Sequence, residues 1–403
     1  MTAPSSTAGT RTLSALWRAV FLVSFPFGIL AFVLPIYGRE LGASALEVGA
    51  FFSAFSIVPV VVRPLLGRAL DRWGRRPFLL AGLAGYLAAA LAFALADTVW
   101  MLTLARFLQG IGAAFLWLTA FTMVADMAAS GGRGLNFGLI DEATNRGAII
   151  GTALGFAFIF TLQRGGDLDW RSVWWMLFAV YGLTTIAAFG IAWRGARETR
   201  PAVPSGAPAS RAVSRRLLTL MGIVFVTGAS SAMVWPMLMI FLQDSLHAEV
   251  DGLARAYLPA ALISSFLPSR MGLISDRFGR RKPMILGLLI GAAASALIPH
   301  LRSLAALTGL WAVESAGYAA SVPAERAFVA DIAGEDVRGT SYGLYTFAYF
   351  LGSAIGPLAG GWMYDQFSPA MPFYLNTAVL AFGALLVAVA LREPARAGGT
   401  TPA

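Results

Sequence analysis

Ionisable and amide side chains interrupt the long apolar stretches of this 403-residue sequence at only a few positions. The set comprises Arg106, Gln109, Asp141, Glu142, Asn145, Arg146, Glu314 and Tyr318. A charge deep in the hydrocarbon of a membrane costs about 2.5–3.5 kcal/mol or more, so such residues usually line a polar path. Burial disfavours the charged form of a carboxylic acid, whereas a neighbouring Arg106 would favour it, so Asp141 or Glu314 could take up and release a proton. We predict that the set lines a cavity for a solute and for protons; the alternative is a salt-bridge network that only fixes helix packing.

Residues 135–160 predict one helix with two different faces. At about 100° per residue, its polar residues fall within one sector and its regularly spaced glycines on the opposite side. The glycines are Gly147, Gly151 and Gly155. Glycine permits the close approach of a neighbouring helix, which leaves the polar face for a cavity. Glu142 and Arg146 are four residues apart on that face and can neutralise each other.

The composition excludes an ordinary soluble protein. The chain is 58% hydrophobic and 13% charged, with a mean hydropathy of +0.70, whereas soluble domains carry about 25% charged residues. Apolar runs of about 20 residues, long enough to cross a bilayer, recur along nearly the whole sequence. The sequence lacks cysteine and a phosphate-binding loop for ATP, and its two histidines have no ligand-spaced partner. We therefore expect no metal, no cofactor and no enzymatic activity.

The basic residues gather in alternate loops between the apolar runs. The clusters are Arg68, Arg72, Arg75 and Arg76; Arg194, Arg197, Arg200, Arg211, Arg215 and Arg216; and Arg277, Arg280, Arg281 and Lys282. This alternation is the positive-inside pattern of a multi-pass membrane protein, and it predicts that both chain ends lie in the cytoplasm. It also argues against nucleic acid as the partner of a chain whose net charge is +9.

An internal repeat relates the two halves of the sequence. Gly67, Asp71, Gly74, Arg75 and Arg76 recur 205 positions later as Gly272, Asp276, Gly279, Arg280 and Arg281. The glycines of residues 147–155 recur as Gly352, Gly356 and Gly360. Repeats of this kind indicate two copies of one design, and six spans per half make the copies parallel. The prediction is an all-α membrane protein with twelve transmembrane helices in two pseudo-symmetric six-helix bundles.

The composition also predicts how the chain is divided. A small, polar cytoplasmic tail over residues 1–15 precedes the first bundle, residues 16–194. Residues 195–215 are rich in Pro, Ser, Gly and Arg and predict a linker, because such a segment cannot bury a core. The second bundle covers residues 216–392, and residues 393–403 form a second cytoplasmic tail.

The two Arg-rich loops predict a cytoplasmic latch between the halves. Its residues are Gly67, Asp71, Arg72, Gly74, Arg75 and Asp126 in the first half, and Gly272, Asp276, Arg280 and Asp331 in the second. Asp126 is placed to pair with Arg75, and Asp331 with Arg280. Asp71 lies at the membrane edge, where the dipole of a helix N-terminus stabilises a carboxylate by about 0.3–1 kcal/mol.

Two motifs resemble a known family. Gly67-x-x-x-Asp71-Arg72-x-Gly74-Arg75-Arg76 resembles the signature loop between helices 2 and 3 of the major facilitator superfamily. Arg106-x-x-Gln109-Gly110-x-Gly112 resembles the helix 4 motif of that superfamily, which is frequent in proton-driven antiporters. Together with the repeat, the resemblance covers essentially the whole chain. It implies a secondary active transporter that works by alternating access in a cell inner membrane, with a small-molecule substrate and a monomeric state.

Further residues resemble one branch of the family. Arg63-Pro64 and Ala143-Thr144-Asn145 are similar to bacterial sugar-efflux and drug-efflux members with twelve helices. The efflux motif Gly-x-x-x-Gly-Pro-x-x-Gly-Gly belongs in helix 5, yet here it is intact in helix 11, around Pro357. The resemblance implies proton-coupled efflux of a small organic solute or drug. The alternatives are a proton-coupled importer of a sugar or organic anion, since Arg106 and Arg146 suit an anion, and a transport-inactive sensor or scaffold.

Overall fold

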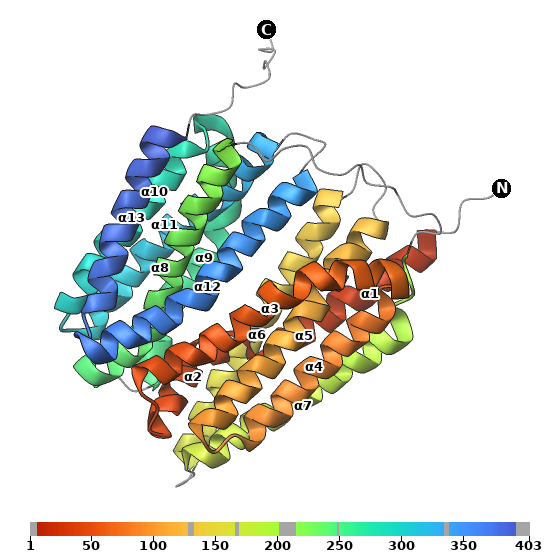
Figure 1. Cartoon of the computed structure of the whole chain (residues 1–403). Coiled ribbons are helices and arrows are strands. Elements are labelled where there is room, and N and C mark those ends of the chain that lie inside the picture. The colour runs from red at the N-terminus through yellow and green to blue at the C-terminus, as the bar shows by residue number, and fades with distance from the viewer. Residues whose placement is uncertain are drawn as a thin grey trace. The chain divides into compact units, whose positions relative to one another are not determined.

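The computed structural model describes residues 6–127, 133–165, 169–200, 215–247, 250–333 and 338–391 (Figure 1). The described residues are almost entirely α-helical, and none of them forms a strand. The chain divides into two compact units. Unit 1 comprises Met1–Ala207 with Leu238–Ile240, and unit 2 comprises Pro208–Met237 with Phe241–Ala403.

Each unit is a bundle of helices. In unit 1 they are α1 (Ser6–Val23), α2 (Pro26–Glu40), α3 (Ala45–Trp73), α4 (Arg76–Leu95), α5 (Val99–Met127), α6 (Arg133–Gly165) and α7 (Trp170–Gly195). After the connecting segment come α8 (Arg215–Leu246), α9 (Val250–Phe278), α10 (Arg281–Leu297), a 3-10 turn (Ile298–His300), α11 (Leu304–Ala333), α12 (Arg338–Gln366) and α13 (Met371–Ala390).

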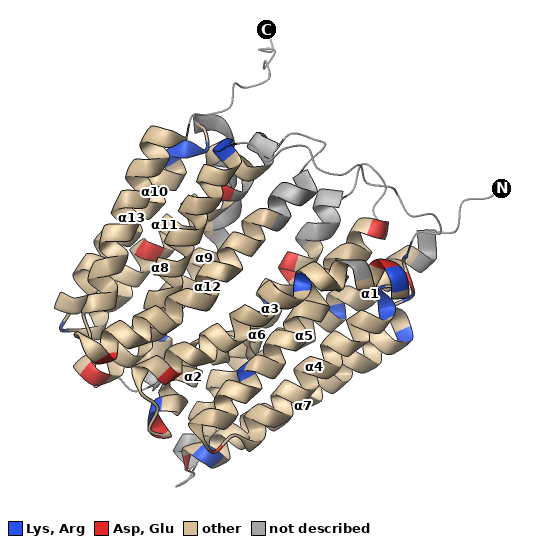
Figure 2. Ribbon diagram, in the orientation of Figure 1, with Lys and Arg blue, Asp and Glu red and all other residues tan. Residues whose placement is uncertain are grey.

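Nine helical segments of the described chain are long and apolar enough to cross a membrane, with α1 and α2 counted together as Gly9–Glu40. The other three predicted spans fall on α9, α11 and α12, which have 29 or 30 residues but carry more polar side chains. In α11, for example, Glu314, Ser315 and Tyr318 lie near the middle. Within each unit, the charged residues gather mainly at the helix ends (Figure 2). The fold is that of an all-α membrane protein.

The predicted N-terminal tail is wrong over most of its length, because α1 begins at Ser6. Thr12 and Leu16 on this helix are buried, and the Thr12 hydroxyl accepts a hydrogen bond from the backbone N–H of Arg197 at 3.4 Å. Packing therefore orders a stretch whose small, polar composition does not signal a helix. The first candidate span, Gly9–Glu40, consists of two helices, because Pro26 has no N–H to continue the hydrogen-bond ladder of α1.

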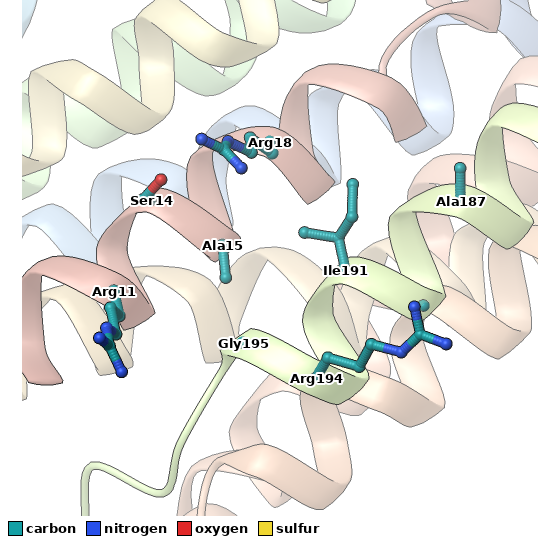
Figure 3. A pocket seen from close by; sticks show the side chains of 9 residues that line it. Arg11, Ser14, Ala15, Arg18, Ala187, Ile191, Arg194 and Gly195 are labelled. Atoms are coloured by element: carbon teal, nitrogen blue, oxygen red, sulfur yellow. The ribbon is translucent and has the colours of Figure 1, made fainter.

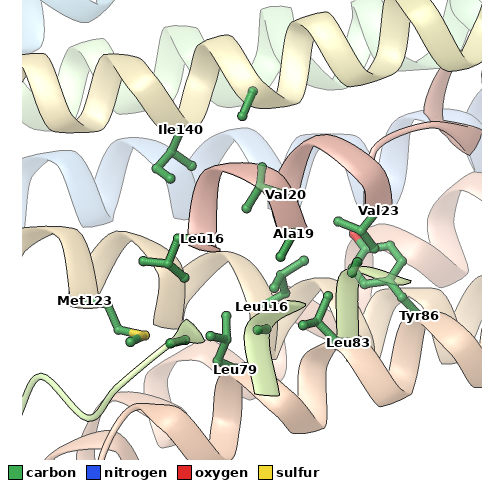
Figure 4. Close-up of a cluster of buried hydrophobic side chains, with 14 of the residues drawn as sticks. Leu16, Ala19, Val20, Val23, Leu79, Leu83, Tyr86, Leu116, Met123 and Ile140 are labelled. Atoms are coloured by element: carbon green, nitrogen blue, oxygen red, sulfur yellow. The ribbon is translucent and has the colours of Figure 1, made fainter. Parts of the chain in front are cut away.

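The core of unit 1 brings α1, α4, α5, α6 and α7 together. Fully buried side chains from these helices interlock, including Leu16, Leu79, Leu116 and Ile140 (Figure 4). Unit 2 has a corresponding core in which α8, α10, α11, α12 and α13 meet around Leu220 and Phe328. Each unit thus has its own hydrophobic interior, as the internal repeat requires.

The regularly spaced glycines of α6 (Gly147, Gly151 and Gly155) and of α12 (Gly352, Gly356 and Gly360) form two glycine ladders. Both ladders lie in tight helix–helix contacts. A Cβ added at Gly151 of α6 would collide with the backbone of Phe25 at the α1–α2 junction. A Cβ added at Gly356 of α12 would collide with the backbone oxygen of Ala229 on α8. In each unit the helix with the ladder therefore packs closely against the first span, in the same register, because only glycine leaves room for the neighbouring backbone.

Gly151→Leu and Gly356→Leu are expected to destabilise the protein by about 1–3 kcal/mol each, because the side chain must push two backbones apart. Thermal unfolding in detergent measures the effect. Gly222→Leu is the matched control, since a Cβ at this exposed position of α8 meets no atom within 4 Å. Wild-type unfolding temperatures for both ladder variants would contradict this account of the ladders.

Candidate functional site

A buried guanidinium organises the Arg-rich end of unit 1. The Nε atom of Arg75 lies 2.9 Å from Oδ2 of Asp126, and its Nη2 atom lies 3.1 Å from Oδ1 of Asp71. Its third hydrogen bond, from Nη1, goes to the backbone oxygen of Leu70 at 2.8 Å. The side chains of Arg75 and Asp126 are only 7% and 11% exposed, whereas that of Asp71 is 76% exposed. The pairing expected between Arg75 and Asp126 is therefore present, and it joins the α3–α4 loop to the end of α5.

Glu198, just after α7, is the residue of this cluster that the sequence did not reveal. Its carboxylate accepts hydrogen bonds from the backbone N–H groups of Arg75 at 2.8 Å and Arg76 at 3.0 Å. These groups form the N-terminus of α4, where a negative charge complements the helix dipole. A signal did exist, because Arg197-Glu198 after the last span of unit 1 recurs as Arg392-Glu393, outside the described residues. Part of the predicted linker is thus fixed in place, because Glu198 bonds to the helix end.

Gly74 is required at this junction for two reasons. It ends α3 with φ of 89°, a left-handed conformation that favours glycine. A Cβ at this position would also lie 2.5 Å from Oε2 of Glu198. By contrast, a Cβ at Gly67 would meet no described atom within 4 Å. Arg72 is exposed, and its backbone oxygen accepts a hydrogen bond from the Arg200 side chain at 2.9 Å.

The hydrogen bonds from the start of α4 to Glu198 predict that the stability of the fold depends on pH. Burial opposes ionisation of this carboxylate, but backbone hydrogen bonds from Arg75, Arg76, Arg200 and Thr199 outweigh it and hold the pKa of Glu198 below its ordinary value of 4.5. A lowered folded-state pKa stabilises the fold above pH 4.5 and ceases to do so as the pH falls through the folded value. Because the group is largely solvated, Glu198→Gln should cost only about 1 kcal/mol at pH 7. Thermal unfolding from pH 7 to pH 4 should show the difference from wild type shrinking; a constant difference would contradict the cap.

Unit 2 repeats part of this arrangement. Nη1 of Arg280 lies 3.4 Å from Oγ of Ser275, the position equivalent to Leu70. Arg281 donates to the backbone oxygen of Val387 on α13 at 3.2 Å, as Arg76 donates to that of Trp193 on α7 at 2.8 Å. Gly279 matches Gly74, with φ of 94°. Of the predicted latch residues, Gly272, Asp276 and Asp331 lie on described helices, but their side chains are outside what the structure describes.

In the interior of unit 1, Arg106 of α5 is satisfied by protein groups. Its Nε atom donates to the backbone oxygen of Phe51 at 3.1 Å, and Nη1 donates to Oε1 of Gln109 at 2.7 Å. The guanidinium carbon also lies 5.0 and 4.6 Å from the ring centroids of Phe52 and Phe55. Within the described part of unit 1 Arg106 pairs with no carboxylate, because its side chain is buried against α3. Its predicted effect on proton release from Asp141 or Glu314 stays a prediction.

The polar residues of α6 form a separate group. Nη1 of Arg146 lies 2.9 Å from Oε1 of Glu142, the neutralising pair that their spacing predicts. Asp141 and Asn145 are exposed, whereas the three glycines of the same helix are buried. The helix therefore separates a polar face from a packing face.

In unit 2, an acidic residue lies one helical turn from an aromatic cluster. Trp235 of α8, Tyr257 of α9 and Trp311 of α11 pack together, with centroid distances of 5.3–6.2 Å. Glu314 follows Trp311 by three residues, so the two share a face of α11. Glu314 is half-buried and has no hydrogen bond or ion pair within the described part of the chain. Tyr318, one turn further on, is exposed.

Comparison with known proteins identifies the family. The sequence model of the Major Facilitator Superfamily matches residues 16–269 and 220–403, which together cover nearly the whole chain. The protein belongs to the major facilitator superfamily. Solved structures with similar folds include the nucleoside transporter NupG (TM-score 0.76, 14% identity, covering 94% of this chain and 100% of that one). A bacterial homologue of the human lysosomal transporter Spinster also matches (TM-score 0.72, 18% identity, covering 96% of each chain).

Relatives of this major facilitator transporter include drug-resistance proteins. Multidrug resistance protein 1 of Bacillus subtilis (strain 168) is 24% identical over 405 residues, covering 97% of this chain and 98% of the relative. Multidrug resistance protein MdtG of Proteus mirabilis (strain HI4320) is 25% identical, covering 98% and 99%. The vesicular acetylcholine transporter of Homo sapiens is 26% identical over 348 residues, covering 81% of this chain and 62% of the relative.

In this transporter, the sequence-predicted interior residues fall into three groups. Arg106 and Gln109 bond to each other, and Glu142 pairs with Arg146. Glu314 lies in the other unit, one helical turn from Trp311, whose ring packs against that of Tyr257. Among the described residues, no group of three or more His, Cys, Asp or Glu side chains could hold a metal ion. Within the described part of the chain, the Glu314 carboxylate has no hydrogen bond or ion pair and so remains available to a charged solute.

Proposed function

We propose that this major facilitator transporter exports a lipophilic organic cation in exchange for protons. The observation that carries the proposal is Glu314, a half-buried carboxylate without a protein partner in the described chain. It lies one helical turn from Trp311, whose ring packs with those of Trp235 and Tyr257. The two arginines that the sequence analysis matched to an anion are already engaged, Arg106 with protein dipoles and rings and Arg146 with Glu142. The Glu314 carboxylate therefore favours a cation over the anion that the sequence left open.

The chemistry of the group fits a lipophilic cation. Aromatic faces attract cations by about 0.5–2 kcal/mol and also provide apolar surface for the rest of a drug-like molecule. A carboxylate adds charge complementarity. Two of the relatives are named for multidrug resistance and one for acetylcholine, itself an organic cation.

Exchange follows if the solute and the proton compete for one carboxylate. A protonated Glu314 is neutral and no longer holds a cation, so proton binding favours release of the solute. The ionised group then binds the next cation. Coupling by competition needs only the proton gradient and no other cofactor, and a single copy of the chain suffices. Asp141 on the polar face of α6 is a second candidate for the proton.

We further propose that the Arg-rich end faces the cytoplasm of a cell inner membrane, as the positive-inside pattern predicts. The Arg75 cluster would then hold α3, α4, α5 and the start of the connecting segment together as one body during alternating access. Accessibility of single cysteines introduced at Arg11 and at Thr98, at opposite ends of the unit 1 helices, tests this orientation, because the wild-type chain has no cysteine. Labelling of the Arg11 position from outside intact cells would contradict it.

Proteoliposomes with an imposed pH gradient test the exchange. Tetraphenylphosphonium, a lipophilic cation, should accumulate inside vesicles whose lumen is acidic, with the membrane potential clamped. Accumulation only when the outside is acidic would indicate symport and import. Uptake of a sugar or an organic anion under the same gradient, without uptake of tetraphenylphosphonium, would overturn the assignment of the substrate class.

A further inference from the structure

A groove between α1 and α7 lies outside the site described above. It has a volume of about 680 Å³ and opens at the Arg-rich end of unit 1. One stripe of each helix lines it, with Arg11 and Arg18 on α1 and Arg194 on α7 (Figure 3). Arg11 and Arg18 are seven residues apart, or two helical turns, so both belong to the face that α1 turns to the groove.

In the part of the chain that the structure describes, the three guanidinium groups make no polar contact that would hold the helices together. All three residues are exposed, and within the described chain none of their side chains has a hydrogen bond or an ion pair. This distinguishes them from Arg75 and Arg76, whose side chains bond to protein groups. Three positive charges around one hollow repel each other, so the site favours an anion with several acceptor oxygens.

The floor of the groove is hollow because its side chains are small. A Cβ added at Gly190 would meet no atom within 4 Å. The two helices touch at Gly195, where an added Cβ would lie 2.6 Å from the Cβ of Ala15. Ala187 and Ile191 make the remaining α7 wall apolar. The groove thus combines a charged rim with an apolar bed.

The groove lies at the end of two candidate membrane spans, Gly9–Glu40 and Trp170–Gly195. A second hollow of about 350 Å³ shares Gly190 and Arg194 with it and adds the stacked rings of Phe189 and Trp193. Tryptophan is typical of the membrane–water interface. Trp193 is exposed and lies under the Arg76 guanidinium, 5.5 Å from its ring centroid. The charged rim therefore lies near the ends of these two spans, and a second hollow adjoins it on α7.

We propose that this groove binds an anionic phospholipid, with its phosphate held by Arg11, Arg18 and Arg194 and its acyl chains in the hollows beside Gly190. The site lies beyond the proposed export function and relies on it only for naming the leaflet, the cytoplasmic one. Basic pockets between transmembrane helices suit such headgroups. A free phosphate would share the arginine contacts but would leave the apolar bed empty, so the structure favours the lipid.

Native mass spectrometry of the full-length protein in a neutral detergent tests the proposal by titration with phosphatidylglycerol, phosphatidylcholine and inorganic phosphate. The first phosphatidylglycerol should bind more tightly than phosphatidylcholine. The triple variant Arg11→Gln, Arg18→Gln, Arg194→Gln should weaken it on the order of a hundredfold, since each basic residue near a membrane surface contributes about a fivefold factor. Binding of inorganic phosphate with comparable affinity, or unchanged lipid affinity in the triple variant, would overturn the site.

Gly190→Leu tests the hollow without changing a charge. The added side chain has room, so the unfolding temperature should stay near wild type while phosphatidylglycerol binding falls. Gly222→Leu and the charge-matched set Arg215→Gln, Arg216→Gln, Lys282→Gln are the controls and should keep wild-type affinity. Wild-type affinity for phosphatidylglycerol in Gly190→Leu, or a loss of affinity in the charge-matched set equal to that in the triple variant, would contradict a site in the groove. Either result would show that the lipid is attracted only by the general positive charge of this end of the protein. Binding is measured without transport, so failure here leaves the proposed export untouched.

Discussion

Glu314→Gln is expected to lower the rate of cation–proton exchange by about 10- to 100-fold. A charged hydrogen-bonding partner contributes about 1.5–3 kcal/mol, and glutamine supplies neither the negative charge nor a titratable group. Residual transport should no longer change with pH between 6 and 8. Uptake of tetraphenylphosphonium into proteoliposomes, measured across that range, checks both effects.

The matched control is Glu325→Gln on the same helix. Glu325 already accepts a hydrogen bond from the Tyr345 hydroxyl at 2.7 Å, which glutamine can also accept. This variant should keep the wild-type rate and pH profile. The assignment of Glu314 fails if its glutamine variant exchanges cations at the wild-type rate with the wild-type pH dependence, and Asp141 then becomes the carboxylate to examine.

Asp126→Ala is expected to destabilise unit 1 by about 3 kcal/mol. Loss of one partner of a buried ion pair leaves an uncompensated charge, which typically costs about 3–5 kcal/mol. The low end applies because Arg75 keeps Asp71 and the Leu70 carbonyl as partners. Thermal unfolding in detergent gives the shift, and Arg75→Gln combined with Asp126→Ala should recover part of the loss.

Asp71→Ala is the companion variant, because it removes the other carboxylate of the same arginine. Asp71 is largely exposed, so the stability change should stay below about 1 kcal/mol. If the cluster works as a gate during transport, this variant remains folded but transports more slowly. Equal destabilisation by the two alanine variants would show that burial does not set the strength of the two ion pairs, and unchanged flux in Asp71→Ala would remove Asp71 from the gate.

The sequence alone determined the features that depend on spacing along the chain. Apolar runs of about 20 residues mark the spans, and the 205-residue offset marks the two halves. Helical periodicity was sufficient to separate the glycine face of α6 from its polar face and to pair Glu142 with Arg146. The Arg75–Asp126 pair could also be anticipated, because both residues end spans at the same membrane surface. These features follow from helix geometry and membrane thickness, which act locally.

Only the tertiary structure decided which distant groups meet. Glu198 caps a helix that begins more than 120 residues earlier, and Arg106 bonds to the carbonyl of Phe51 on another helix. The aromatic cluster of Trp235, Tyr257 and Trp311 comes from three helices, and the groove lined by Arg11 and Arg194 needs the first and last helices of unit 1 side by side. Such contacts depend on how helices are rotated and packed against each other. Packing is set by the sum of many weak contacts between segments far apart in the chain, so no single spacing in the sequence records it.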